Sequence, residues 1–184
     1  MRHRCLGVVA LSGLAGVCAL AQRPQAERLA PFVPSPQAVV ERMLEAADVK
    51  PNELVYDLGC GDGRILITAA REFRAKAVGV ELSEKLVLQA REQVHRLGLD
   101  NRVQIILGDL MNVDLRPADV VTVYLLTDAN EQLKPAFERS LRRGARVVSH
   151  DFKIRGWRPE RVETVRVANR THSIYVYLMP PKKY

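Results

Sequence analysis

The sequence predicts an α/β protein built on a mostly parallel seven-stranded sheet that ends in a C-terminal antiparallel hairpin. Three observations indicate this. Short apolar runs alternate with helical patterns between residues 36 and 149. Within them, Val55–Arg64 reads as a strand, a glycine-rich loop and a helix start. Finally, two β-branched stretches, Arg161–Ala168 and His172–Met179, flank a short polar turn, which is typical of a hairpin.

Length and composition favour one domain. The 184 residues, of which 47% are hydrophobic, are enough for one sizeable core. The formal net charge of +7 favours an acidic protein, nucleic acid or an anionic membrane as partner. Because aromatic residues are few and no Lys/Arg block exceeds two residues, nucleic acid is the weaker expectation.

The N-terminus resembles a secretory leader. Met1–Arg4 is basic, Cys5–Leu20 is apolar, and Ala19–Ala21 offers an A-x-A cleavage site. Residues 1–21 are therefore expected to be a signal peptide, with an uncleaved N-terminal anchor as the alternative, since the apolar run is close to the shortest membrane span. Either interpretation predicts an exported (periplasmic or secreted) or membrane-anchored protein, and a cytoplasmic location is the remaining alternative.

Residues 22–30 are polar and unpatterned, as a linker is, and the folded domain is expected over residues 31–184. Cys60 is the single cysteine outside the leader, so no internal disulfide is expected. It stands between two glycines and is interpreted as a small residue that fits the loop rather than as a nucleophile.

The domain begins with a proline-rich stretch. Its prolines favour an extended segment, and Ser35 is placed to cap a helix over Pro36–Ala47. Two interpretations of Phe32–Ser35 stay open. The segment is either the staple and cap of this helix, or a cover over the ligand and the mouth of the substrate site.

The remaining elements follow in order. We expect Gly98 to end the third helix at its C′ position, and Pro135 to be tolerated only near the first turns of the fourth. The expected strands are Val55–Leu58, Ala77–Glu81, Val103–Leu107, Val120–Leu126 and Arg146–Ser149, and the expected helices are Gly63–Arg74, a helix capped by Ser83, and Asn130–Arg142.

The glycine loop predicts a nucleotide-like ligand. Glycines at 59, 61 and 63 allow positive φ and close approach of a ligand to the backbone, and the helix N-terminus that follows favours an electron-rich group. The dinucleotide fingerprint requires its third glycine at the sixth place, where Arg64 stands. A nicotinamide oxidoreductase is therefore disfavoured.

Acidic residues follow the predicted strands. In an open α/β sheet the ligand lies beyond the carboxyl ends of the strands, where Asp57, Glu81 and Gly108–Leu110 would meet. A carboxylate accepts hydrogen bonds, so Glu81 suits a ribose diol. The alternatives are a solvated strand-end charge at Glu81 and a turn-forming role for Asp109. Asp62 and Arg64 either face the ligand or simply balance each other at the helix start.

The pattern Asp57-Leu-Gly-Cys-Gly-Asp-Gly63, followed by Glu81 at the end of the second strand, resembles the class I S-adenosylmethionine-dependent methyltransferases. The resemblance implies a Rossmann-like seven-stranded fold and S-adenosyl-L-methionine as cofactor. It also implies that the loop backbone binds the methionyl part, that Asp57 orders the loop, and that Asp109 and Leu110 bind adenine. The implied cofactor residues are Ser35, Asp57, Leu58, Gly59, Cys60, Gly61, Gly63, Glu81, Asp109 and Leu110.

Pro31–Ser35, the glycine loop and Gly79–Glu81 are similar to the protein-lysine methyltransferases of the group that acts on the ATP synthase c-subunit and adenine nucleotide translocase, and to their short bacterial relatives. The resemblance covers about Pro31–Phe152. It implies N-methylation of a lysine, with a membrane-associated protein as the implied substrate. A small-molecule or RNA methyltransferase and a non-catalytic S-adenosylmethionine-binding module are the alternatives.

Methyl transfer needs alignment of a nucleophile more than a strong base. Candidate catalytic residues are Tyr124 at the end of the fourth strand and His150 and Asp151 at the end of the fifth, with strand-end hydrogen bonding as the alternative for the latter two. As sequence neighbours, the side chains of His150 and Asp151 would point apart if the strand continued, so they are not expected to form a ready-made dyad. No third His or Cys has metal-ligand spacing, so no metal site is expected. Phe152 and Trp157 either wall the pocket or belong to the core.

Overall fold

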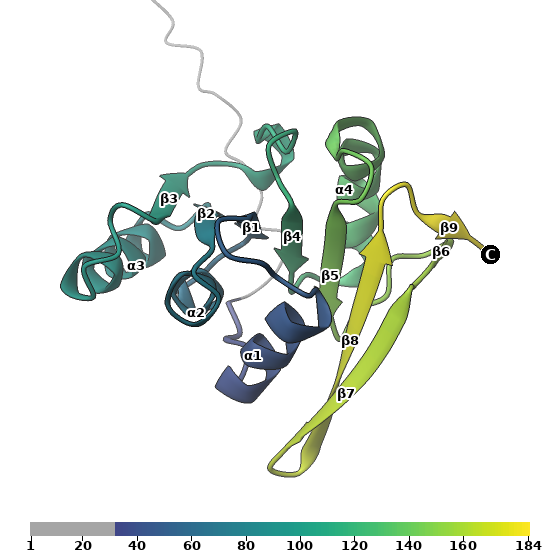
Figure 1. The fold of residues 1–184 in the computed structure, drawn as a ribbon, viewed down its shortest axis with the longest axis horizontal. Coiled ribbons are helices and arrows are strands. Elements are labelled where there is room, and N and C mark those ends of the chain that lie inside the picture. Colours follow the sequence, from purple (N-terminus) through teal and green to yellow (C-terminus); the bar gives the residue numbers. More distant parts are fainter. Residues whose placement is uncertain (1–31) are drawn as a thin grey trace, which may run out of the picture.

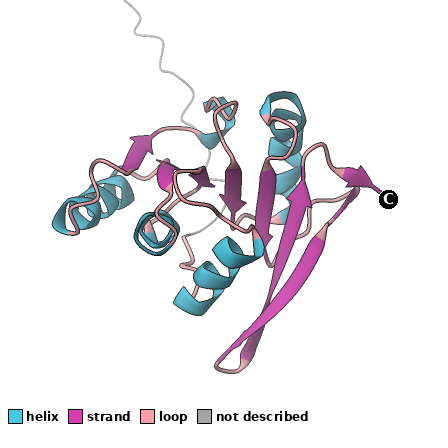
Figure 2. Ribbon diagram, viewed as in Figure 1, coloured by secondary structure: helices cyan, strands magenta, loops and turns pink. Residues whose placement is uncertain are grey.

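The computed structural model describes residues 32–184, so the predicted leader and linker lie outside the described residues. Helices and strands alternate along the chain until the C-terminal hairpin (Figures 1 and 2). The helices are α1 (Gln37–Ala46), α2 (Arg64–Glu72), α3 (Glu84–Arg96), α4 (Thr127–Ser140) and the short 3-10 helix η1 (Leu110–Asn112). The strands are β1 (Leu54–Leu58), β2 (Lys76–Glu81), β3 (Val103–Leu107), β4 (Val120–Val123), β5 (Arg146–His150), β6 (Trp157–Arg158), β7 (Arg161–Val167), β8 (Arg170–Leu178) and β9 (Lys182–Lys183).

The main sheet has seven strands in the order β3-β2-β1-β4-β5-β8-β7. The first five are parallel, β8 pairs antiparallel with β5, and β7 pairs antiparallel with β8. The predicted fold class and terminal hairpin are therefore confirmed. A second sheet of two short strands, β6 and β9, was not predicted, because two-residue strands carry no periodic signal.

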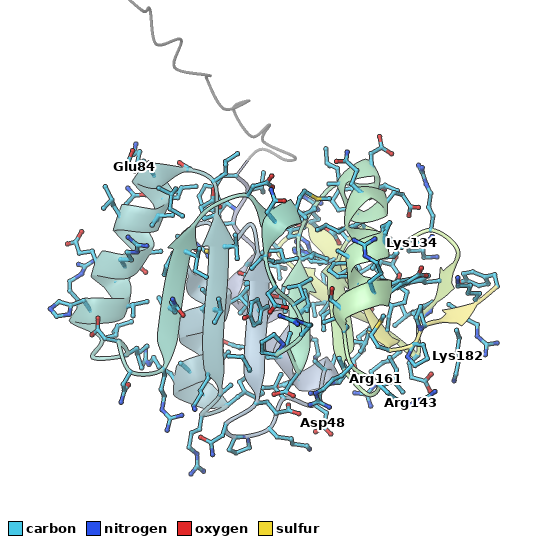
Figure 3. All side chains as sticks on the ribbon, turned by 90° about the horizontal axis from the view of Figure 1, so that it is seen from above. Asp48, Glu84, Lys134, Arg143, Arg161 and Lys182 are labelled. Atoms are coloured by element: carbon cyan, nitrogen blue, oxygen red, sulfur yellow. The ribbon has the colours of Figure 1, made fainter. Side chains whose placement is uncertain are left out.

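Both faces of the sheet are covered. Helices α1, α2 and α3 enclose one hydrophobic cluster on one face, and α4 with η1 encloses a second cluster on the other. Figure 3 looks along this layered body from above and shows side chains filling the space between the sheet and its helices. Among residues 32–184, no helix combines the length and apolar character that crossing a bilayer requires.

Several local predictions were wrong. Ser35 was expected to cap the first helix, yet the N-cap residue of α1 is Pro36. Ser83 does occupy the N-cap of α3 as predicted, but its side chain makes no capping hydrogen bond. Strand β4 ends at Val123, and α4 begins at Thr127 rather than Asn130, so Pro135 lies in the interior of the helix instead of its first turns. Gly98, with φ +65°, does follow the end of α3 as predicted.

Candidate active site

A pocket opens at the carboxyl ends of β1 and β4. From this pair of neighbouring strands the chain continues outward in opposite directions, which makes it the position where open α/β sheets bind ligands. The pocket contains about 610 Å³ of empty space and is open to solvent. Its lining residues are Phe32, Val33, Pro34, Ser35, Asp57, Gly59, Cys60, Asp62, Arg64, Ile65, Glu81, Leu86, Tyr124 and Leu125. Ile65, Leu86 and Leu125 were not predicted as lining residues.

The three loop glycines have left-handed backbones. Gly59, Gly61 and Gly63 adopt φ of +82°, +54° and +80°, a region that costs other residues about 1–2 kcal/mol. Gly61 also allows close contact with the segment in front of it, since an added Cβ would lie 2.2 Å from Cε2 of Phe32. Glycine at 61 is thus required twice, for its backbone angle and for its lack of a side chain.

The loop amides are used within the protein. The amides of Gly59, Cys60 and Gly61 donate to acceptors in β2 and so anchor the loop to that strand, while the Gly63 amide donates within the loop. The Val80 carbonyl accepts from the Gly59 amide at 2.8 Å and from the Cys60 amide at 3.1 Å. Glu81 Oε2 accepts from the Gly61 amide at 3.0 Å, and the Cys60 carbonyl accepts from the Gly63 amide at 2.9 Å. The role of the Leu58–Gly63 backbone in binding the methionyl group stays a prediction.

Asp57 is buried at the end of β1 and accepts a hydrogen bond of 2.7 Å from the Thr122 hydroxyl. Burial, reinforced by the charges of Glu81 and Asp62, raises the pKa of Asp57 to about 7. Burial also raises the pKa of the Cys60 thiol, which therefore stays protonated and inert, in line with its interpretation as a small loop residue. Neighbouring Leu58 is fully buried and does not line the pocket.

Glu81 lines the pocket and organises the turn around it. One carboxylate oxygen accepts from the Gly61 amide at 3.0 Å, and the other accepts from the Ser83 amide at 2.9 Å. Each oxygen has a second lone pair, so the side chain can still accept from a ligand hydroxyl. Its ribose-binding role stays a prediction, and its alternative as a solvated charge does not fit a side chain that is buried and doubly bonded.

Asp109 and Leu110 lie beside the pocket and do not line it. The Asp109 carboxylate accepts from the Met111 amide at 2.9 Å and from Asn112 Nδ2 at 3.0 Å, which is the turn-forming role left open above. The preceding Gly108 amide donates to the Glu81 carbonyl at 3.0 Å, so this turn adjoins the glutamate. Contact of Asp109 and Leu110 with adenine stays a prediction.

Phe32–Ser35 covers the pocket, as the second interpretation of this segment expected. Arg64 holds it in place, because its Nη1 donates to the Ser35 carbonyl at 2.7 Å while the rest of the guanidinium pairs with both oxygens of Asp62. The Asp62–Arg64 pair therefore balances its own charges and also anchors the cover.

The opposite wall begins with Tyr124. Its ring lines the pocket and stacks on His150, with the ring centroids 3.8 Å apart. His150 lies fully buried behind it, and this burial lowers the pKa of His150 to about 4, so the imidazole is neutral at physiological pH. Trp157, considered above as a pocket wall, is instead core: it is buried against Phe137 and Tyr177. Phe152 contacts the far side of this wall, with its ring 6.1 Å from that of Tyr124.

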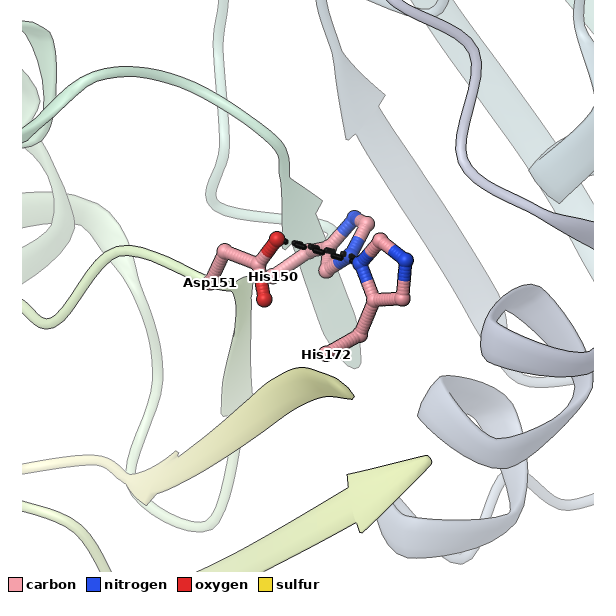
Figure 4. A group of neighbouring side chains, drawn as sticks. All are labelled: His150, Asp151 and His172. Atoms are coloured by element: carbon pink, nitrogen blue, oxygen red, sulfur yellow. Dashed lines mark hydrogen bonds and ion pairs between the residues drawn. The ribbon is translucent and has the colours of Figure 1, made fainter. Parts of the chain in front are cut away.

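His150 and Asp151 were expected not to form a pair because a continuing strand would point them apart, but β5 ends at His150 and the two side chains meet. Asp151 adopts φ +59°, which ends the extended backbone, and its Oδ2 lies 3.5 Å from His150 Nε2. The hairpin then adds His172 from β8, whose Nδ1 lies 2.9 Å from His150 Nε2 and 3.1 Å from Asp151 Oδ2 (Figure 4). Sequence spacing gave no signal for His172, because strand pairing alone brings it to this cluster.

The three side chains could offer one metal-ligand atom each, all within 4.8 Å of one another. Spacing in the sequence therefore missed a possible third ligand. However, Arg170 Nη2 already donates to Asp151 Oδ2 at 2.9 Å, and His150 Nδ1 is hydrogen-bonded to the Ser35 hydroxyl at 2.9 Å. A cation would have to compete with the guanidinium for the same carboxylate oxygen, so hydrogen bonding accounts for the cluster.

With this geometry in place, comparison with known proteins identifies the family. Residues 57–161 match the family model described as the ANTKMT methyltransferase domain. The chain belongs to this methyltransferase family. A protein-lysine N-methyltransferase of Saccharolobus islandicus is 48% identical over 154 residues, which are 83% of this chain and 96% of that protein. The mouse adenine nucleotide translocase lysine N-methyltransferase is 34% identical over 147 residues, which are 80% of this chain and 62% of that longer protein.

A solved structure supports the same family assignment. The crystal structure of an RNA methyltransferase from Salinibacter ruber in complex with S-adenosyl-L-homocysteine superposes with a TM-score of 0.75 at 42% identity, covering 83% of this chain and 96% of that one. The chain is an S-adenosylmethionine-dependent methyltransferase. Its pocket fits a cationic cofactor, because among residues 32–184 three carboxylates (Asp57, Asp62, Glu81) line it and the one lining cation, Arg64, is paired with Asp62.

Proposed function

We propose that this methyltransferase N-methylates lysine side chains of a protein. The observation that carries the proposal is the match to the archaeal protein-lysine N-methyltransferase, which extends over 96% of that protein at 48% identity. The match therefore extends over nearly the whole length of a compact relative and not only over a cofactor-binding segment. The name of the mouse relative points to the same acceptor group.

The apolar part of the pocket lining supports a lysine amine as the methyl acceptor. S-adenosylmethionine supplies a methyl group on a sulfonium, which is an activated leaving group. What the protein has to do is exclude water and align a neutral amine with that methyl. Phe32, Val33 and Leu125 form apolar parts of the lining, against which the methylenes of a lysine can pack.

Tyr124 is the proposed residue beside the acceptor. It lines the pocket at the end of β4, and stacking on His150 fixes its ring. A phenol can accept a hydrogen bond from an amine or orient its lone pair. His150 and Asp151, the other predicted catalytic residues, do not line the pocket, so any effect they have on the reaction passes through the residues in front of them.

RNA is the second candidate acceptor. The Salinibacter ruber structure is titled an RNA methyltransferase at 42% identity, and the present chain carries a net charge of +7. Against RNA stands the polarity of the pocket, whose unpaired charges are carboxylates that repel a phosphate backbone.

The test is to incubate the full chain with methyl-tritiated S-adenosylmethionine and an extract of its own cells, then treat separate samples with protease or ribonuclease. We expect the label to be sensitive to protease and to appear as methyllysine after acid hydrolysis. Label removed by ribonuclease alone would replace the proposal with the RNA alternative. Tyr124→Phe serves to test the acceptor side, and is expected to lower kcat while leaving cofactor affinity within about twofold.

We also propose that the protein is exported or anchored at a membrane. This proposal rests on the apolar run Cys5–Leu20, which favours export or anchoring and would bring the domain to substrates at a membrane. Fractionation of cells followed by mass determination of the mature N-terminus tests it. An intact, soluble chain in the cytoplasmic fraction would contradict it without affecting the lysine assignment.

A further inference from the structure

Four side chains form a continuous hydrogen-bonded chain behind the pocket. Ser35 Oγ lies 2.9 Å from His150 Nδ1, His150 Nε2 lies 2.9 Å from His172 Nδ1, and His172 Nδ1 lies 3.1 Å from Asp151 Oδ2. The serine and both histidines are buried, at 4%, 0% and 4% exposure. In such surroundings each donor needs an acceptor, so the positions of the protons follow from the two residues at the ends of this series, Asp151 and Ser35.

Asp151 determines the direction of each hydrogen bond in the series. Its Oδ1 accepts from the Ser173 amide at 2.8 Å and its Oδ2 accepts from Arg170 at 2.9 Å, which keeps it a carboxylate. A carboxylate only accepts hydrogen bonds, so the close contact with His172 requires a proton on His172 Nδ1. That proton also faces His150 Nε2, which must then be the acceptor of the pair.

The same reasoning gives the direction of the hydrogen bond between His150 and Ser35. His150 is neutral, so it carries a single ring proton, and with Nε2 accepting, that proton is on Nδ1. His150 Nδ1 therefore donates to the Ser35 oxygen. The hydroxyl proton of Ser35 cannot point back along the same line, so it is available to another acceptor at a residue that lines the pocket.

A donor at this place meets a need of the cofactor. The amino-acid end of S-adenosylmethionine carries a carboxylate, while the pocket is lined by Asp57, Asp62 and Glu81. The four loop amides described above are already bonded within the protein. Arg64 is occupied by Asp62 and by the Ser35 carbonyl. Within residues 32–184, the Ser35 hydroxyl is thus a donor on a lining residue whose proton has no assigned acceptor and can serve an anion.

We propose that Asp151 acts through His172 and His150 to hold the Ser35 hydroxyl as a hydrogen-bond donor for the carboxylate of the cofactor. In this arrangement Ser35 is a cofactor-binding residue, and the other three are positioning residues. The inference depends on the cofactor and not on the methyl acceptor, so the lysine assignment can fail while this one stands.

The test compares two ligands on the full chain by calorimetry: S-adenosylhomocysteine, and methylthioadenosine, which lacks the amino-acid end. Loss of a hydrogen bond to a charged group predicts that Ser35→Ala weakens S-adenosylhomocysteine by about 10- to 30-fold. Methylthioadenosine should change by no more than about twofold, and Ser35→Thr should restore most of the loss because it keeps the hydroxyl.

Asp151→Asn should weaken S-adenosylhomocysteine by about 3- to 10-fold, again with methylthioadenosine unchanged, because the serine proton is no longer directed. The matched control is Asp100→Asn, which alters an exposed His95–Asp100 contact of 3.2 Å far from the pocket and should change neither affinity. Equal weakening of both ligands by Ser35→Ala or Asp151→Asn would mean a merely structural role and would overturn the proposal.

Nitrogen NMR of the histidine rings provides a readout that does not depend on affinity. We expect both His150 and His172 to carry a proton on Nδ1 in the wild type, and Asp151→Asn to shift His150 toward the Nε2 form. A wild-type His150 protonated on Nε2 would overturn the proposal. So would stoichiometric binding of Zn²⁺ by the full chain that is lost in His172→Asn, because the three side chains would then be metal ligands.

Discussion

The two walls of the pocket are built in different ways. On the cofactor side, Asp57, the glycine loop and Glu81 come from β1, the loop and β2, which follow one another in the chain. On the opposite side, Ser35, Tyr124, His150 and His172 come from four separate segments, and the Ser35–His150 bond joins residues 115 positions apart. The first wall can be read from a motif, while the second exists only once the sheet has formed.

The walls also differ in charge. The cofactor side holds the pocket's carboxylates, and burial raises the pKa of Asp57 to about 7. On the other side burial lowers the pKa of His150 to about 4. Desolvation therefore moves both groups toward neutrality, but Asp57 can still gain negative charge when a cation arrives, whereas His150 stays neutral at physiological pH. This asymmetry suits a cofactor that is cationic at its centre.

The largest effect is expected from removing the anchor of the cofactor wall. Glu81→Ala deletes the acceptor for the Gly61 and Ser83 amides together with the predicted ribose contact. The affinity for S-adenosylmethionine, measured by calorimetry, should fall by at least about 100-fold, or roughly 3 kcal/mol. Glu81→Gln keeps one acceptor oxygen and should give an intermediate loss. An affinity within threefold of wild type would show that the ribose binds elsewhere.

Asp57→Asn should change stability with a definite sign. The folded pKa lies near 7 and the ordinary value near 3.8, so between these pH values the unfolded state loses its proton first. The free energy of unfolding of the wild type is thus reduced as pH rises through this window. Asparagine cannot ionise and can still accept from Thr122.

We therefore expect Asp57→Asn to be more stable than wild type by about 2 kcal/mol above about pH 8, with the difference vanishing near about pH 4. Urea unfolding at a series of pH values measures this. His150 contributes the opposite slope, because its lowered pKa means that stability is lost as pH falls from 6.5 toward about 4, and this contribution is common to both proteins. A difference independent of pH would contradict the expectation.

A smaller effect is expected where the two sides of the pocket touch through Gly61 and Phe32. Gly61→Ala places a methyl group in the space of the Phe32 ring and in a left-handed backbone. Cofactor affinity should fall by about 10-fold. Adding Phe32→Ala should recover part of the loss, since it removes the overlap but not the backbone cost. Strictly additive losses in this double-mutant cycle would show that the two residues do not meet in solution.

The smallest effect is expected at Cys60. Its thiol is buried and its pKa is raised, so it has no chemical role in the reaction. Cys60→Ala should leave methyl transfer within about twofold and reduce stability by no more than about 1 kcal/mol. Activity assays and urea unfolding of this variant are the measurements. A large loss of kcat with unchanged cofactor affinity would assign the thiol a part in catalysis.

The sequence by itself determined the sheet, the hairpin, the loop and its acidic partner. These features depend on local rules: periodicity identifies strands and helices, and alternate glycines identify a tight turn whatever surrounds it. It located element ends less well, as the shorter β4 and the interior Pro135 show, because termini are fixed by packing rather than by propensity.

Only the tertiary structure decided what the polar residues of the second wall do. Ser35 has the chemistry of a helix cap, but its hydroxyl is bonded to His150 instead. Asp151 turns back onto its neighbour through a left-handed backbone, and His172 arrives by antiparallel pairing of β8 with β5. A hydrogen bond between buried groups far apart in sequence forms only when packing brings them within about 3 Å, and no local pattern encodes that distance.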